Sequence, residues 1–261
     1  MKTYTKESLT EALLNIRSMG WVPCSRPGNV GGIGNTIEDL LGIPENNLPI
    51  PNAAEWELKT QRVNTTSLTT LFHMEPSPRV LRFVPNILLP FYGWPHQEAG
   101  KKHPPNEMSF RQTISGLGRS DRGFTVVVNN LLRKLEISFD SSAVSTRHSE
   151  WLETVKMRIG LGELDPQPYW GFDDLFHKAG TKLLNTFYIE AETKVIDGQT
   201  HYSYQNITIL KGFKIENFLY AIESGDIFVD FDARTGHNHG TKFRLRRNKL
   251  PNLYSEVIKI A

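Results

Sequence analysis

The chain contains 261 residues, 39% of them hydrophobic and 22% charged, an ordinary composition for a globular protein in water. It has no run of about eighteen apolar residues and no apolar segment near its N-terminus, so we expect neither a membrane-spanning helix nor a secretory signal. A single cysteine excludes an internal disulfide and is typical of the cytoplasm. The net charge of +2 neither requires nor excludes a nucleic-acid partner.

The first third of the chain is predicted to hold two helices and then two strands. Apolar residues at helical spacing predict a helix over residues 6–19. A second, short helix is expected to start at Asn35 or Thr36, both good N-caps, and to end at Gly42. Strands are predicted over residues 54–60 and 66–73.

The rest of the chain is predicted to consist mainly of strands and loops. Residues 84–123 are rich in proline and glycine and predict long loops. An Asp197-Gly198 turn between two strand-like runs predicts a hairpin, and residues 215–222 show the spacing of an amphipathic helix. A short helix is expected from Asp173, with further strands over 124–129, 134–140, 226–232 and 241–247. This mixture is typical of an α+β fold.

Glu57-Leu58-Lys59 lies in the first predicted strand. Side chains two residues apart share a face, so we expect the carboxylate and the ammonium side by side, with Leu58 and Trp56 facing a core. A carboxylate binds a divalent cation, and a neighbouring ammonium orients or deprotonates a water, which is the chemistry of phosphodiester hydrolysis. Surface ion pairs have the same spacing, so the pair alone does not decide between the two interpretations.

Further segments support the hydrolytic interpretation. Upstream, Glu38 on the predicted helix is either an added metal or water contact or a plain solvated residue. The segments that carry a family resemblance are Gly28–Leu41, Glu45–Leu48, Glu57–Thr60, Leu68–His73, Gln112–Gly116, Tyr169–Leu175, Glu190–Lys194, Gly225–Asp230 and His237–Arg244. In this order, and over nearly the whole chain, they resemble the MvaI/BcnI restriction endonucleases, relatives of the mismatch-repair nickase MutH.

The resemblance implies a PD-(D/E)xK nuclease fold of the α+β class, in which helices flank a mixed central sheet and two lobes form a DNA-binding cleft. We expect a single endonuclease chain over 1–261, with a catalytic lobe mainly from 1–80 and 110–165 and a recognition lobe mainly from 166–261. The resemblance also implies a monomer in a prokaryotic cytoplasm. A companion DNA methyltransferase is expected genetically, not as a bound subunit.

By the same resemblance, residues 52 and 57 are the metal ligands, Lys59 is the catalytic lysine and Glu38 is the helix carboxylate. The family has an aspartate where this chain has Asn52. An amide keeps a carbonyl oxygen but loses a negative charge, so we expect weaker metal binding. We favour the interpretation that an engineered or other change at this position impairs cleavage. The alternative is a natural variant that recruits Glu55, which has the strand parity of Glu57.

The resemblance places the DNA-contacting residues in two segments. They are His73, His237, Asn238, His239, Lys242 and Arg244. Imidazoles exchange hydrogen bonds with base edges, and arginine suits bidentate contact with guanine. A zinc site on His237 and His239 is the competing interpretation, which the lack of an obvious third ligand nearby disfavours.

These features predict a type II restriction endonuclease. The resemblance implies that it uses Mg²⁺, with Mn²⁺ as a substitute, to hydrolyse double-stranded DNA one strand at a time at a short GC-rich site of the CC-N-GG kind. Two alternatives stay open. A MutH-like site-specific nickase would cut one strand and need an activating partner. A catalytically dead, sequence-specific DNA-binding protein would account for Asn52 and cut nothing.

Overall fold

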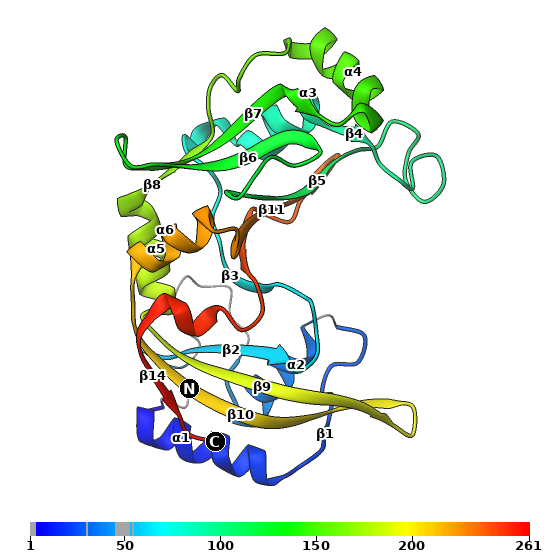
Figure 1. Ribbon diagram of the computed structural model, residues 1–261. Coiled ribbons are helices and arrows are strands. Elements are labelled where there is room, and N and C mark those ends of the chain that lie inside the picture. Colours follow the sequence, from blue (N-terminus) through cyan, green and yellow to red (C-terminus); the bar gives the residue numbers. More distant parts are fainter. Residues whose placement is uncertain (1–3, 30, 45–52, 54) are drawn as a thin grey trace. The chain divides into compact units, whose positions relative to one another are not determined.

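The computed structural model describes residues 4–29, 31–44, 53 and 55–261 (Figure 1). The chain forms two compact units. Unit 1 consists of Met1–Thr69, Phe176–Asn217 and Arg246–Ala261, and unit 2 consists of Thr70–Leu175 and Phe218–Leu245. In the described part of the chain, no helix is long and apolar enough to cross a membrane.

Unit 1 is built on a mixed sheet with the strand order β1-β10-β9-β2, and β14 pairs with β10. β9 and β10 form a long antiparallel hairpin, whereas β2 runs parallel to β9 at the end of this order. The predicted Asp197-Gly198 turn is confirmed, with positive φ at both residues. The elements are α1 (Lys6–Ser18), β1 (Val22–Pro23), α2 (Gly32–Leu41), β2 (Glu57–Arg62), β9 (Asn185–Ile196), β10 (Gln199–Phe213), a 3₁₀ turn (Leu250–Leu253) and β14 (Tyr254–Lys259).

The core of unit 1 lies between this sheet and the helices α1 and α2. Apolar residues of both helices form one buried cluster with Trp56 and Leu58, which are 3% and 6% exposed. This confirms the expected inward face of the strand. α2 approaches β2 closely at Gly34: a Cβ added to this glycine would lie only 3.2 Å from Thr60 Oγ1. The helix therefore packs on the face of β2 that carries Leu58 and Thr60.

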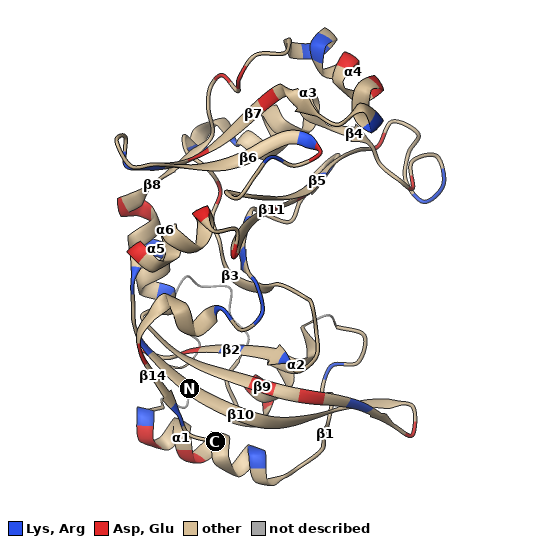
Figure 2. Ribbon diagram, in the orientation of Figure 1, with Lys and Arg blue, Asp and Glu red and all other residues tan. Residues whose placement is uncertain are grey.

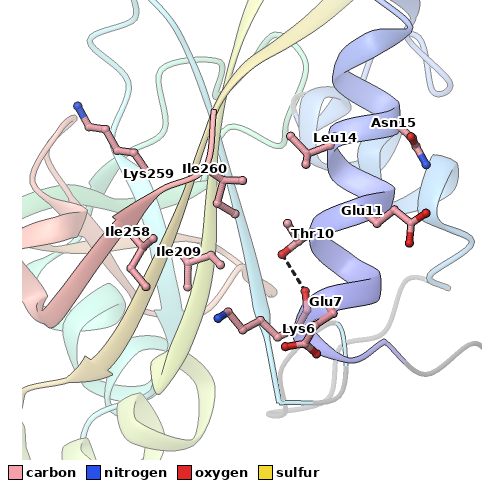
Figure 3. A pocket seen from close by; sticks show the side chains of 10 residues that line it. All are labelled: Lys6, Glu7, Thr10, Glu11, Leu14, Asn15, Ile209, Ile258, Lys259 and Ile260. Atoms are coloured by element: carbon pink, nitrogen blue, oxygen red, sulfur yellow. Dashed lines mark hydrogen bonds between the residues drawn. The ribbon is translucent and has the colours of Figure 1, made fainter.

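The outer side of α1 borders a groove of about 620 Å³. Figure 3 shows Leu14 of α1 opposite Ile260, which follows β14. The hydroxyl of Thr10 donates to the carbonyl of Lys6 at 2.8 Å. None of the candidate site residues that the structure describes lines this groove. Its lining residues are Lys6, Glu7, Thr10, Glu11, Leu14, Asn15, Ile209, Ile258, Lys259 and Ile260.

Unit 2 contains two sheets. One has the order β3-β13-β11-β5-β4, with β12 paired to β11, and the other has the order β6-β7-β8. The strands are β3 (Thr69–His73), β4 (Trp94–Pro95), β5 (Met108–Ser115), β6 (Arg122–Asn129), β7 (Lys134–Val144), β8 (Tyr169–Gly171), β11 (Ile227–Arg234), β12 (His237–Asn238) and β13 (Lys242–Leu245). The helices are a π-helix (Val84–Leu88), α3 (Leu89–Tyr92), α4 (Ser149–Ile159) and two 3₁₀ turns (Arg79–Leu81 and Thr146–His148). Two further helices, α5 (Phe172–Leu183) and α6 (Ile215–Glu223), contain the points where the chain passes between units.

Two local predictions need correction. Residues 84–123 are not mainly loop, because β5 pairs with β11 from Ser109 to Ser115 and buries Phe110 and Ile114. That pairing is long-range, so the local sequence does not reveal it. The second helix starts at Gly32 rather than at the predicted cap. Thr36 lies inside it, and its hydroxyl accepts a hydrogen bond from the Ser25 N–H at 3.1 Å.

The two units divide the chain differently from the lobes expected from the sequence. Residues 110–165 belong to unit 2, whereas residues 185–213 belong to unit 1. The physical reason is strand pairing: β9 lies directly beside β2 and completes its sheet, and β5 pairs with β11. These partners are far apart in the sequence, so composition and periodicity do not indicate which strands share a sheet.

Candidate active site and recognition surface

Glu57 and Lys59 meet at the start of β2. Lys59 Nζ lies 2.8 Å from Glu57 Oε1, as the strand spacing predicted. The Glu57 side chain is only 2% exposed and that of Lys59 13%, so this is not a solvated surface pair. A carboxylate buried to this degree is stable as an anion only when cations or hydrogen-bond donors compensate it.

Lys182 supplies a second cation that the sequence did not indicate. Its Nζ lies 3.2 Å from Glu57 Oε2, and its side chain is 18% exposed. Glu57 pairs in register with Thr186, near the start of β9, and α5 ends just before that strand. The parallel pairing therefore brings the last turn of α5 to the beginning of β2. No local signal in the sequence predicts this contact.

One oxygen of this carboxylate suits a divalent cation. Glu57 Oε2 is buried and accepts no hydrogen bond from the residues that the structure describes, although the Lys182 ammonium is close. A hard cation prefers such an oxygen, so Glu57 fits the metal-ligand role that the resemblance implies. Asn52, the other expected ligand, lies outside the described residues. Among the residues that are described, no group of three or more His, Cys, Asp or Glu side chains is arranged to hold a metal.

Polar side-chain contacts link strands of this sheet near Glu57. The hydroxyls of Thr186 and Tyr254 lie 2.7 Å apart, and the Tyr188 hydroxyl donates to Gln61 Oε1 at 2.8 Å. Burial, and to a lesser extent the negative charge of Glu57, raise the pKa of Tyr254. This phenol therefore stays neutral at physiological pH and acts as a hydrogen-bonding group rather than as a base.

The other carboxylates expected near the pair have different positions. Glu38 is half-buried on α2, the helix that packs against β2. Its role as the helix carboxylate stays a prediction. The expectation that Glu55 shares the strand parity of Glu57 is wrong. Glu55 is exposed in the turn closed by reciprocal backbone hydrogen bonds between Ala53 and Trp56, and the strand begins only at Glu57.

A metal titration tests whether Lys182 shares the metal-binding oxygen. In an Asn52→Asp background, we expect Lys182→Ala to bind Mn²⁺ about threefold to thirtyfold more tightly, because a positive charge next to Glu57 Oε2 is removed. Lys211→Ala is the matched control, since Lys211 pairs with Glu256 at 3.1 Å elsewhere in unit 1. Calorimetric titration gives both affinities. Equal Mn²⁺ affinity with and without Lys182 would show that this ammonium does not compete for the oxygen.

The predicted DNA-contacting residues come together in unit 2. β3, which ends at His73, is the neighbour of β13, which carries Lys242 and Arg244. Immediately before β13, His237 and His239 are exposed, and their rings pack edge-to-face at 4.3 Å between centroids. The strand order thus places residues from both predicted segments at one edge of a sheet.

Two aspartates of β11 order the basic residues beside them. Asp230 pairs with Arg244 at 3.2 Å and accepts a hydrogen bond from the Thr113 hydroxyl at 2.7 Å. Asp232 pairs with Arg111 at 2.8 Å and with Lys242 at 3.5 Å. Burial raises the pKa of Asp232, but the hydrogen bond and positive charge of Arg111, with Lys242 and His239, outweigh burial and lower it. Asp232 is therefore ionised at neutral pH, and the lysine and both arginines are held in defined positions.

Glu190 and Trp170, both in segments that carry the family resemblance, make structural contacts. Figure 2 shows acidic and basic residues along β9, and Glu190 of that strand lies 3.8 Å from Arg247. Trp170 is fully buried, and its indole N–H donates to the carbonyl of Met74 at 3.1 Å. Glu190 therefore forms an ion pair, and Trp170 packs in the core of unit 2.

Comparison with known proteins identifies the family. The sequence model described as the MvaI/BcnI restriction endonuclease family matches residues 10–254. The chain belongs to the MvaI/BcnI restriction endonuclease family. The fold of this family member agrees with a solved structure described as a complex of restriction endonuclease MvaI with its cognate DNA substrate. The TM-score is 0.78 and the identity 27%, over 99% of this chain and 100% of that chain.

A second solved structure is described as restriction endonuclease MvaI in the absence of DNA. It matches the family member with a TM-score of 0.54 and 26% identity, over 100% of each chain. No curated protein sequence matches significantly. The family model and the two structures confirm the resemblance and the nuclease fold, and the roles of individual residues stay predictions.

Proposed function

We propose that this MvaI/BcnI family member is a type II restriction endonuclease. It acts as a monomer that hydrolyses double-stranded DNA one strand at a time, at a short GC-rich site of the CC-N-GG kind. Its cofactor is Mg²⁺, with Mn²⁺ as a substitute. Asn52 makes the present sequence a cleavage-impaired form.

The contact between Glu57 and Lys59 carries this proposal. Their side chains lie 2.8 Å apart on β2, the last strand in the sheet order. Both side chains are almost buried, whereas those of a surface ion pair would be solvated. Burying two charges is costly, and a purely structural role would be served equally well by apolar residues. A buried carboxylate with two ammonium groups is suited to organising a negatively charged phosphate and a water.

Each residue of the site has a separate role in hydrolysis. Lys59, held by Glu57 Oε1, orients the attacking water and stabilises the negative charge that develops as this water attacks the phosphate. Lys182, on the other side of the same carboxylate, stabilises charge on the phosphate. Glu57 and residue 52 would hold a divalent cation, which would supply Lewis-acid chemistry. The Asn52 amide supplies less negative charge for that cation than the family aspartate.

Unit 2 supplies the recognition residues in this proposal. Arg244 is the best candidate for guanine contact, since Asp230 holds its guanidinium at 3.2 Å. We expect Arg244→Ala to weaken binding to the preferred sequence by about tenfold to a hundredfold, with a smaller loss on unrelated DNA. Arg133→Ala is the control, because Arg133 pairs with an exposed aspartate, Asp173. An equal loss on every sequence in a fluorescence-anisotropy titration would assign Arg244 to phosphate contact.

A supercoiled plasmid separates the proposal from its two rivals. With Asn52→Asp and Mg²⁺, we expect nicked circles first and then linear DNA, without any added protein. A MutH-like nickase would stop at nicked circles unless an activating partner were present. A dead DNA-binding protein would leave the plasmid supercoiled with Mg²⁺ or Mn²⁺ at any concentration, and Asn52→Asp would not rescue it.

A further inference from the structure

Glu75, two residues beyond β3, is tied to the loop between β12 and β13. Its Oε1 accepts a hydrogen bond from the Thr241 N–H at 2.9 Å and lies 3.4 Å from Asn238 Nδ2. Its Oε2 accepts the Thr241 hydroxyl at 3.1 Å. The Met74 N–H also donates to the Thr241 carbonyl at 2.9 Å. One carboxylate therefore gathers three donors from a loop that is distant from it in the sequence.

The loop has a defined shape of its own. Asn238 Oδ1 accepts the Gly240 N–H at 3.0 Å, and the His239 N–H donates to the Asp232 carbonyl at 3.0 Å. Gly240 has φ of +80°, a conformation that other residues rarely adopt, and a Cβ there would lie 3.5 Å from both His73 and Glu75. The loop thus passes directly beside His73 with its backbone fixed at both ends.

The geometry points to Glu75 as a positioning residue for sequence readout, an inference that rests on the proposed function. Glu75 holds the loop of His237 and His239 against the strand that ends at His73 before DNA binds. A loop that is already ordered loses less conformational entropy on binding. The affinity therefore increases most for the DNA sequence that fits the ordered loop. Asn238 acts with Glu75, since its Oδ1 accepts the Gly240 N–H within the loop and its Nδ2 donates to Glu75 Oε1.

A direct DNA contact is a poorer role for Glu75. Phosphates repel a carboxylate, and the acceptor positions of Glu75 already face three protein donors. Thr241 is fully buried, so loss of Glu75 would leave buried polar groups without partners and loosen the loop. Glutamine reproduces the contacts, because its oxygen accepts from the Thr241 N–H and its amide donates to the Thr241 hydroxyl.

Selection from a randomised DNA duplex library tests this role. The unaltered chain, Glu75→Ala, Glu75→Gln and Glu98→Ala are each bound to the library with Ca²⁺ in place of Mg²⁺, and the retained duplexes are sequenced. Glu98, paired with Lys102 in another loop of unit 2, is the matched control. We expect Glu75→Ala to lose about tenfold or more of the motif enrichment, with unchanged affinity for a random duplex and unchanged salt dependence. Glu75→Gln and Glu98→Ala should keep the motif.

If Glu75→Ala is less stable, amide hydrogen exchange on the free protein distinguishes local loosening of the loop from general loss of the fold. The Thr241 N–H should exchange at least about tenfold faster in Glu75→Ala, while amides in the β11–β5 pairing keep their protection. Equal enrichment by Glu75→Ala and the unaltered chain, or equal Thr241 exchange, would overturn the role of Glu75. So would loss of the motif in Glu75→Gln. Failure of the unaltered chain to select any motif would instead contradict the proposed function.

Discussion

Asn52→Asp is expected to turn an inactive or very slow chain into an Mg²⁺-dependent endonuclease. The change restores one negative charge among the ligands of a hard cation, so metal affinity rises and cleavage increases by about a hundredfold or more. The rate is measured from conversion of supercoiled plasmid at saturating Mg²⁺, and EDTA should abolish it. Asn52→Ala and Asn52→Glu are the matched variants, since one removes the oxygen and the other displaces it.

Two results would contradict this account of position 52. Robust cleavage by the chain as written would show that the amide does not impair the site. Cleavage by Asn52→Ala equal to that of Asn52→Asp would show that the residue is not a ligand. Glu55 offers no compensation, because its side chain is exposed in the turn before β2 rather than on the face of Glu57.

Lys59→Ala is expected to abolish the restored activity while leaving DNA binding nearly intact. In the Asn52→Asp background, cleavage should fall by about a hundredfold to ten-thousandfold, the range for loss of a positioned acid–base or charge-stabilising group. The fold should survive, because Lys182 still lies 3.2 Å from Glu57 and compensates the buried carboxylate. Single-turnover cleavage and anisotropy binding, measured on the same duplex, separate the two effects.

Lys156→Ala provides the control for loss of a lysine. Lys156 pairs with Glu153 at 3.4 Å on the exposed side of α4, so its removal should leave both cleavage and binding unchanged. A Lys59→Ala variant that cut at the rate of this control would remove Lys59 from the mechanism. A Lys59→Ala variant that lost binding as well as cleavage would assign Lys59 to DNA contact rather than to the chemical step.

The part of the site that was predictable from the sequence is the part with short sequence separation. Glu57 and Lys59 share a face because the strand period is two, and Trp56 and Leu58 are buried for the same reason. The helices α1 and α6 and the Asp-Gly hairpin followed from local spacing as well. Each of these features depends only on neighbouring residues.

The contacts that were not predictable depend on pairing between distant strands. Lys182 reaches Glu57 only because β9 lies parallel to β2 with Thr186 opposite Glu57. Glu75 reaches Thr241 only because β3 and β13 are neighbours in one sheet. The grouping of residues 110–165 with β11 has the same origin. Periodicity identifies strands but does not reveal their partners. These contacts are therefore evident only from the structure.

The most direct test of site-specific hydrolysis is the sequence at the ends of the cut DNA. Phage or plasmid DNA is digested with Asn52→Asp and Mg²⁺, and the ends of all products are sequenced. We expect every break to fall at the same short GC-rich site, with both strands cut at each site. Breaks scattered over unrelated sequences, or intact DNA under every metal condition, would contradict the assignment of this chain as a restriction endonuclease that cleaves through Glu57 and Lys59.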